Sequence, residues 1–227
     1  MNPFSHLKIR ELIVALGSPF FPPFDPPPLN LPTRLSDIDR MKADVTGEAI
    51  DQFHNSVVEN VSTKFGLLAR SDYESYGSGY ASFADVFLFR KKALKIQSRK
   101  ISEVVKGVKK TVDLEDHIYE GVRFLLSREA PVFAFGMDTE STTYQGGKCR
   151  GGSSGFLSKE RLGSVPAYWW PKNTVAVTRM FQAHGLKILD RATLATDLDF
   201  DAEIATNLKL TDNPRFAVFD VFFNWMD

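Results

Sequence analysis

The chain has 227 residues, of which 43% are hydrophobic and 25% are charged. This composition is that of an ordinary folded domain, and it excludes collagen-like, coiled-coil and wholly disordered proteins. The 28 basic residues balance the 28 acidic ones, so net charge does not direct the protein toward nucleic acid or an anionic membrane.

The cysteine content and the apolar runs indicate a compartment. A single cysteine, Cys149, excludes an intrachain disulfide and a zinc site built from cysteines alone. The first residues lack a basic segment followed by an apolar core, so they match a signal peptide poorly. No apolar run approaches the roughly 20 residues that a membrane span needs. We therefore expect a cytoplasmic protein that forms one domain over 1–227 and has no membrane partner.

The N-terminal part is marked by proline. Seven of the 12 prolines fall in the segment 19–32, and proline is incompatible with a helix interior or a central strand. The phenylalanines and leucines between these prolines are too apolar for a solvated linker. The segment is predicted to be an extended strap packed on the domain, after a helix near 7–16. A Pro-rich ligand for an aromatic groove is the alternative.

The next segments carry helix and strand patterns. Apolar residues recur every three or four positions over 46–64, which predicts a helix. The composition of 71–80 is that of a loop. Residues 83–89 are rich in phenylalanine and valine and predict a strand. Residues 93–97 are expected to be its hairpin partner across a basic turn at 90–92.

The middle of the chain is predicted to be helical, with one strand and one loop. Apolar residues at helical spacing predict helices over 101–112 and 114–126. Residues 132–135 read as a short buried strand. Five glycines and few apolar residues make 139–155 a flexible Gly-rich loop.

The C-terminal part completes the predicted fold. It holds a helix over 174–184, a strand over 186–189, and a buried segment over 216–225 that fits a helix or a strand. The predicted fold class is α+β: a single domain with helices packed on a small sheet and an N-terminal Pro-rich strap.

Charge is segregated along the chain. The stretch 90–110 holds nine basic residues and one acid, and acids outnumber bases over 190–227. The favoured interpretation is that these are solvated faces which meet within the fold. Contact of the basic stretch with nucleic acid phosphates or with an acidic protein face is the alternative.

Aromatic and acidic side chains are the candidate partner-binding residues. A loop that combines tyrosine with serine and glycine resembles the chemistry of antibody paratopes, and a Tyr-Trp-Trp run beside a turn offers an anchor of the hot-spot type. An acidic surface could mimic phosphate and meet the basic cleft of a nuclease. The predicted set is Tyr73, Tyr76, Tyr80, Tyr168, Trp169, Trp170, Asp197, Asp199, Asp201 and Glu203.

Asp138 and Glu140 are the best enzymatic candidates. They follow the apolar strand 132–135, so both carboxylates would lie at one strand end, as Mg²⁺-dependent phosphodiesterases require. The run Asp138-Thr-Glu140-Ser-Thr resembles the first motif of DEDD-type exonucleases, and the resemblance covers these five residues. It implies a metal-dependent nuclease as the alternative function. The four histidines have no metal-ligand spacing, so no cofactor is predicted.

Two aromatic segments, Ala167-Tyr-Trp-Trp-Pro171 and Phe219-Asp-Val-Phe-Phe-Asn-Trp-Met-Asp227, resemble bacterial toxin-immunity proteins. The resemblance implies a small cytosolic α+β protein that occludes a toxin domain without turnover. The favoured function is therefore a non-catalytic protein-binding module, an inhibitor of the immunity type. We expect a protein partner, such as a toxin domain, rather than nucleic acid.

Overall fold

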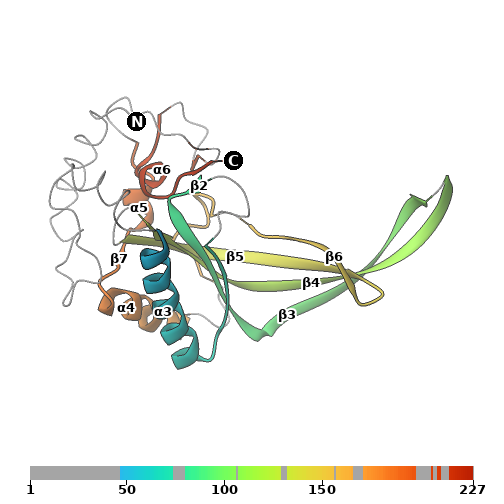
Figure 1. The fold of residues 1–227 in the computed structure, drawn as a ribbon, viewed down its shortest axis with the longest axis horizontal. Helices are drawn as coiled ribbons and strands as arrows, with labels where there is room; N and C mark the ends of the chain where they lie inside the picture. Colours follow the sequence, from blue (N-terminus) through green and yellow to red (C-terminus); the bar gives the residue numbers. More distant parts are fainter. Residues whose placement is uncertain are drawn as a thin grey trace.

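The computed structural model describes residues 47–73, 80–105, 107–128, 132–155, 157–165, 171–197, 206, 209–210 and 215–226 (Figure 1). The strap predicted at 19–32 and the helix predicted at 7–16 lie outside these residues. Seven of the predicted partner-binding residues also lie outside them: Tyr76, Tyr168, Trp169, Trp170, Asp199, Asp201 and Glu203.

A long antiparallel sheet is the main element of the fold. Its path runs through β1 (Leu68–Asp72), β3 (Phe83–Val105), β4 (Val108–Ser127), β5 (Val132–Gln145) and β6 (Lys148–Ser153), in that order. A sixth strand, β7 (Lys187–Ile188), pairs parallel to β5. The short strands β2 (Tyr80–Ala81) and β8 (Trp225–Met226) pair separately. The predicted fold of helices packed on a small sheet is therefore wrong, because strands dominate the described chain.

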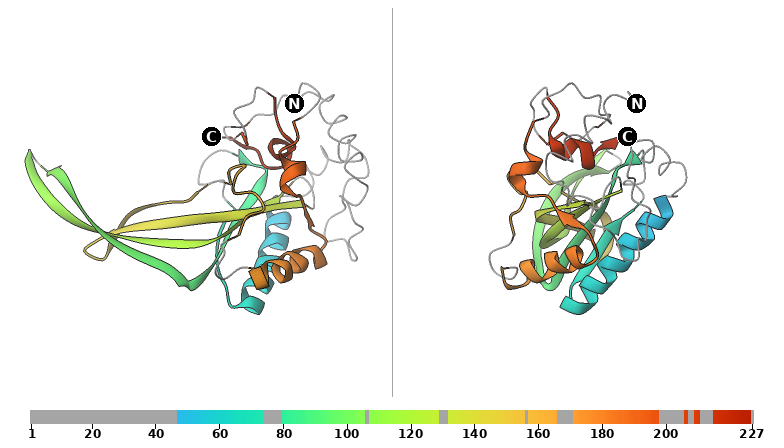
Figure 2. Two further views of the ribbon diagram at one scale, coloured as in Figure 1. Left: turned by 180° about the vertical axis from the view of Figure 1, so that it is seen from behind. Right: turned by 90° about the vertical axis from the view of Figure 1, so that its left-hand side faces the viewer.

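Helices lie on both faces of the part of the sheet that forms the core. Figure 2 shows α3 (Gly47–Phe65) and α4 (Pro171–Ala183) on one face, and α5 (Arg191–Leu194) and α6 (Val218–Phe222) on the other. We call these the α3/α4 face and the α5/α6 face. In the part of the chain that the structure describes, no helix is long and apolar enough to cross a membrane.

Aromatic rings fill the core under the α3/α4 face. Phe124 of β4 is fully buried. Its ring stacks on Phe181 of α4 with centroids 4.8 Å apart and on Phe135 of β5 at 5.8 Å. Phe133 packs against Phe181 at 5.2 Å. Such ring pairs add to the free energy already gained from apolar burial, so this cluster holds α4 to the sheet.

The core under the α5/α6 face contains the C-terminal aromatic segment. Phe219, Phe222 and Phe223 are buried there, and Trp225 packs half-buried against them. The buried carboxylate of Asp220 accepts hydrogen bonds from the backbone N–H groups of Leu210 and Ala217 at 2.9 and 2.7 Å. Burial raises the pKa of Asp220. The segment that resembles immunity proteins is thus mainly core.

The helix predicted over 101–112 is wrong. Ile101 to Val105 end β3, and Val108 to Val112 begin β4. The chain reverses at Gly107, where φ is 76°, a backbone conformation that glycine adopts readily. All the apolar residues that suggested the helix are β-branched, and they fit a strand better.

The helix predicted over 114–126 is also wrong, because the whole range lies in β4. Residues 121–127 are buried on both faces of the sheet. A strand buried on both faces is apolar without alternation, and such a run imitates helical spacing.

The turn predicted at 90–92 is a β-bulge within β3. Phe89 pairs with Gly121 and Leu94 pairs with Tyr119, so residues 90–93 oppose the single residue Glu120. A bulge bends a strand and increases its twist, and Figure 1 shows the bend in β3. The hairpin predicted for 93–97 is therefore wrong, since β3 continues through it.

The flexible loop predicted over 139–155 is wrong as well. Most of it forms the end of β5 and all of β6, which pair from Ser141 opposite Ser153 to Gln145 opposite Lys148. Two of the glycines, Gly146 and Gly147, form the tight turn between these strands, and their φ is positive.

Five sequence predictions are confirmed. The helix over 46–64 is α3, the strand over 83–89 begins β3, and the strand over 132–135 begins β5. The helix over 174–184 is α4, which begins at Pro171, and the strand over 186–189 is β7. The segment 216–225 holds both alternatives, because the short helix α6 precedes β8.

His54 of α3 is 2% exposed, and among the described residues nothing hydrogen-bonds its Nδ1. Burial, with a smaller effect from the positive charge of Arg128, lowers the pKa of His54 from 6.5 to about 3. The folded protein therefore keeps this imidazole neutral at pH values at which the unfolded chain protonates it.

We expect His54 to make the fold sensitive to acid. Between pH 7 and pH 5 the unfolded chain gains a proton at this residue, so its contribution to the free energy of unfolding falls by about 2 kcal/mol. Urea denaturation at both pH values would measure this, and His54→Phe should remove that part of the loss. Equal losses in the wild type and the variant would contradict the assignment.

Candidate functional site

A β-arm projects from the core and is the most distinctive surface of the molecule. It consists of residues 94–105 of β3, 108–120 of β4, 139–145 of β5, and β6, and it extends well beyond the helices (Figures 1 and 2). β5 pairs with β4 only as far as Glu115. Beyond that residue, β3 and β4 continue alone as a two-stranded ribbon for about 20 Å, at about 3.3 Å per residue.

Ion pairs link the strands of the arm. Arg99 Nε donates to Asp116 Oδ2 at 2.6 Å, and Lys95 and Lys100 of β3 pair with Glu120 and Asp113 of β4 at 3.4 and 3.7 Å. In each of these pairs the acid comes from the neighbouring strand β4. The basic stretch 90–110 thus meets acids beside it in the sheet, whereas the favoured interpretation expected acids from the C-terminal part.

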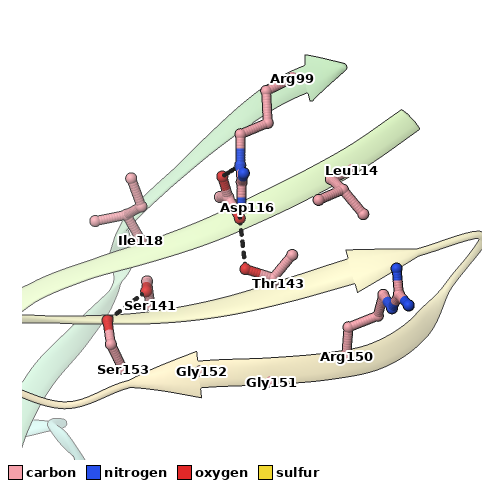
Figure 3. A pocket seen from close by; sticks show the side chains of 10 residues that line it. All are labelled: Arg99, Leu114, Asp116, Ile118, Ser141, Thr143, Arg150, Gly151, Gly152 and Ser153. Atoms are coloured by element: carbon pink, nitrogen blue, oxygen red, sulfur yellow. Dashed lines mark hydrogen bonds and ion pairs between the residues drawn. The ribbon is translucent and has the colours of Figure 1, made fainter. Parts of the chain in front are cut away.

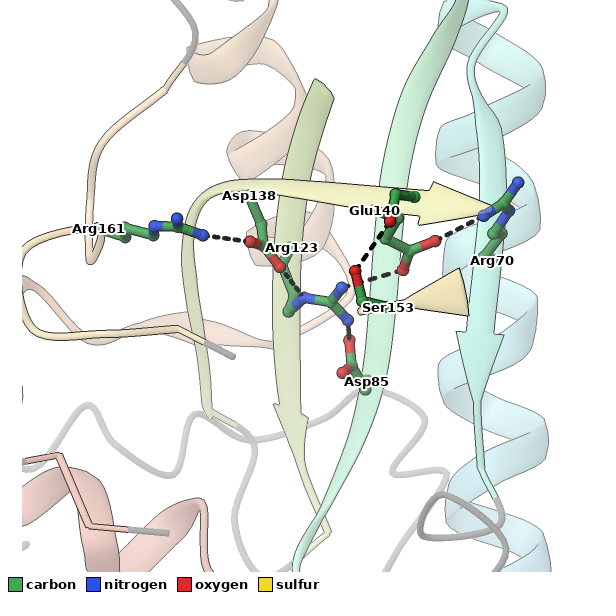
Figure 4. A network of polar contacts seen from close by, with 8 residues as sticks. Arg70, Asp85, Arg123, Asp138, Glu140, Ser153 and Arg161 are labelled. Carbon is green, nitrogen blue, oxygen red and sulfur yellow. Dashed lines mark hydrogen bonds and ion pairs between the residues drawn. The ribbon is translucent and has the colours of Figure 1, made fainter. Parts of the chain in front are cut away.

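A buried ion network lies at the base of the arm, under its α5/α6 face (Figure 4). Arg123 of β4 is its centre. Its Nε donates to Asp138 Oδ2 at 2.6 Å, its Nη1 to Asp85 Oδ1 at 2.5 Å, and its Nη2 to Glu140 Oε1 at 2.9 Å. Burial alone would lower the pKa of Arg123, but the charges of Asp85 and Asp138 raise it. One guanidinium therefore joins β3, β4 and β5.

Two further arginines complete the network from outside. Arg161 Nη1 donates to Asp138 Oδ1 at 2.5 Å, and Arg70 Nη1 donates to Glu140 Oε2 at 2.9 Å. The Arg70 guanidinium also lies over the rings of Phe89 and Tyr119. Three arginines thus balance three carboxylates. A buried ion cluster that is both neutral and hydrogen-bonded avoids the large penalty of an unpaired buried charge.

Asp138 and Glu140 are brought together, as the sequence predicted, but they lie within β5 rather than at a strand end, and they surround an arginine. Asp138 is 0% exposed and Glu140 is 8% exposed, and guanidinium groups engage both oxygens of each carboxylate. Within the described ranges no group of three His, Cys, Asp or Glu side chains could hold a metal ion. The arrangement joins strands, and it leaves neither carboxylate open toward solvent.

The arginines and Asp85 were missed by sequence reasoning. A signal for two of them was present. Asp85 stands within the apolar run 83–89, and Arg123 stands within the apolar run 122–126. A single charge inside a buried strand requires an opposite charge nearby. Two such strands with charges of opposite sign predict a pair.

Gly155 lies directly over the network. A Cβ atom added at this residue would lie 2.6 Å from Oδ2 and 2.7 Å from Cγ of Asp138. We expect Gly155→Ala to lower the free energy of unfolding by about 1–3 kcal/mol, as overpacking of a tight site does. Gly151→Ala is the matched control, because a Cβ there meets nothing within 4 Å. Thermal melts of both variants test this, and equal stabilities would contradict it.

A shallow groove of about 500 Å³ runs along the arm (Figure 3). Its β5 residues Ser141 and Thr143 alternate with the network residues of that strand, so the groove lies on the opposite face of the sheet. Thr143 donates to Asp116 Oδ1 at 2.6 Å, and these hydrogen bonds from Arg99 and Thr143 lower the pKa of Asp116. Of the described residues that line the groove, none is a histidine, cysteine or lysine. Its hydroxyl and guanidinium groups can bind polar groups, but they do not form a nucleophile–base pair.

The predicted partner-binding residues that the structure describes lie away from the arm. Tyr73 follows β1 and packs half-buried against the core under the α3/α4 face. Tyr80 belongs to β2, and Asp197 is exposed at an isolated bridge with Ala217. These residues form no common surface with the tip of the arm.

Comparisons with known proteins identify no relative. No protein-family model, no curated protein and no solved structure matches the chain.

Proposed function

We propose that this protein is a non-catalytic protein-binding module that binds its partner through the β-arm. One observation carries the proposal: the ribbon at the end of the arm exposes apolar side chains on a polar scaffold. Val104 is 72% exposed and Val108 is 58% exposed, and nearer the core Ile96 is 55% exposed. Apolar side chains that stay exposed at the end of a projecting element favour contact with another macromolecule.

The ion network supports this proposal because it fixes the direction of the arm. Arg123 bonds to β3 and to β5 where the arm leaves the core, and ion pairs link β3 to β4 further out. A binding element that is rigid before it meets its partner loses less conformational entropy on binding. The arm is thus suited to reach a site that lies some distance from the core.

The resemblance to immunity proteins suggests what binding achieves. An arm that enters the active-site cleft of a cytosolic toxin domain would block substrate without turnover. We therefore propose inhibition by occlusion, with a protein partner in the cytoplasm. The partner-binding role of residues 168–170 stays a prediction.

A shortened arm tests the proposal. Ile101 and Val112 are opposite each other in the ribbon, so an Asn-Gly turn can replace 102–111 and close the hairpin. None of the described side chains that are removed is buried. We expect the shortened protein to keep its melting temperature within a few degrees. It should lose a stoichiometric protein partner that the full chain retains from native lysate, together with inhibition of that partner. Full retention of the partner would contradict the proposal.

A further inference from the structure

We infer that the tip of the arm is a wedge that enters a cleft in the partner protein, with apolar walls and carboxylates on both rims. The tip is defined here as residues 104–105 and 107–110. This inference rests on the proposed function and specifies the chemistry of the partner. It follows from how apolar and basic side chains are divided between the two faces of the ribbon.

The tip exposes an apolar side chain on each of its two faces. Val104 is opposite Lys109 in the register of β3 and β4, and residues opposite each other in an antiparallel pair share a face. Val108, the neighbour of Lys109, therefore lies on the other face. Both valines are more than half exposed. A flat surface would bury one of these faces, whereas the walls of a cleft bury both.

The lysines are divided in the same way. Lys109 shares its face with Val104, and Lys110 shares its face with Val108. Both lysines are exposed, and within the described ranges neither forms an ion pair. The residue opposite Lys110 is Glu103, whose carboxylate already accepts a hydrogen bond from Arg150 at 2.5 Å. Among the side chains that the structure describes, each face of the wedge thus presents one exposed valine and one lysine without an ion pair.

The distribution of valines and lysines over the two faces determines which partner surface is complementary to the tip. Burial of the valines requires apolar walls, and the lysines require an acid beside each wall, because complementary rim charges guide association and select the partner. An enzyme cleft that contains carboxylates has this character. The basic cleft of a nucleic-acid enzyme would repel the tip. The partner is therefore opposite in charge to the one that an acidic surface at 197–203 would select.

The test is photo-crosslinking in the full chain. A diazirine-bearing aliphatic residue is placed singly at Val104, at Val108, at Ile96 on the stem of the arm, and at Val175, which is 54% exposed on α4 and serves as the control. Each protein is irradiated in native lysate, and the products are identified by mass spectrometry. We expect one protein to be crosslinked from both tip positions and not from Val175, at partner residues that lie on two facing walls of one cleft.

The other outcomes overturn the inference in distinct ways. Crosslinks from only one valine would indicate docking on a flat surface. Crosslinks to a protein from Ile96 alone would refute the wedge and leave the proposed function standing. Lipid or nucleic acid adducts, or no adduct from any arm position, would refute both. Binding to phosphatidylserine vesicles or to DNA and RNA duplexes, measured separately with the wild type, would do the same.

Charge reversal tests the rims once the partner is purified. We expect Lys109→Glu with Lys110→Glu to weaken binding at least tenfold at low salt and to remove most of the dependence of the Kd on salt. Lys91→Glu with Lys92→Glu is the matched control, since these exposed lysines lie at the bulge in the same hairpin. Its Kd should change less than twofold. Equal effects of the two double variants would show that the lysines act by general electrostatic attraction and make no specific contact with the rims. That result would overturn the inference.

Discussion

Arg123→Met is expected to lower the free energy of unfolding by about 3–5 kcal/mol, or to prevent folding. The substitution removes the cation that donates to Asp85, Asp138 and Glu140. Arg161 and Arg70 would still pair with one oxygen each of Asp138 and Glu140. The other oxygen of each of these carboxylates, and Asp85, would lose the hydrogen bond from Arg123. Breaking a buried ion cluster by removing one partner leaves uncompensated charge in the core. Urea denaturation of the variant measures the loss.

Arg99→Met is the matched control. Arg99 makes a charge-assisted hydrogen bond of similar length, to Asp116 at 2.6 Å, but its side chain is 51% exposed. Exposed ion pairs contribute between about 0 and 1 kcal/mol, so this variant should stay close to wild-type stability. Similar losses in the two variants would contradict the view that burial gives the network its importance.

Phe124→Ala should be the most damaging substitution in the apolar core. The Phe124 ring is fully buried and is surrounded by other rings. The centroids of Phe181, Phe135 and Phe133 lie 4.8 to 6.2 Å from its own. Removing a buried phenylalanine creates a cavity and loses transfer free energy, together about 3–5 kcal/mol. Because Phe181 lies on α4, we also expect this helix to lose protection from hydrogen exchange before the rest of the fold.

Ile96→Ala provides the comparison for the arm. Ile96 is 55% exposed, so its truncation should change the free energy of unfolding by no more than about 1 kcal/mol. A loss in Phe124→Ala of less than about 1 kcal/mol would mean that the ring cluster does not hold α4 to the sheet.

The two longer helices, α3 and α4, were predictable because their signal is local. In α3 the apolar spacing persists over 19 residues, and Gly66, with φ of 60°, follows its end as glycine commonly does. The ribbon was not predictable in the same way. Its strands are paired only because the chain reverses at Gly107, and a short apolar run on either side of a turn satisfies the helical period by coincidence.

The candidate site was predictable only in part. The carboxylates of Asp138 and Glu140 do lie together, as two acids at alternate positions of one strand must. Their partners come from remote segments: Arg70 is in β1, and Arg161 lies near Gly163, whose N–H bonds to the carbonyl oxygen of Phe135. Pairing between distant segments depends on sheet order, which periodicity alone does not encode.

The separation of the ribbon from the core has an evolutionary consequence. Proteins stay functional only above a threshold of stability, and most substitutions in a core bring them closer to it. Between Ile101 and Val112 the described side chains are not buried, so substitutions there change folding little. Substitutions at the tip can therefore accumulate and adapt the protein to changes in its partner. Selection for folding acts instead on the core and on the ion network at the base of the arm.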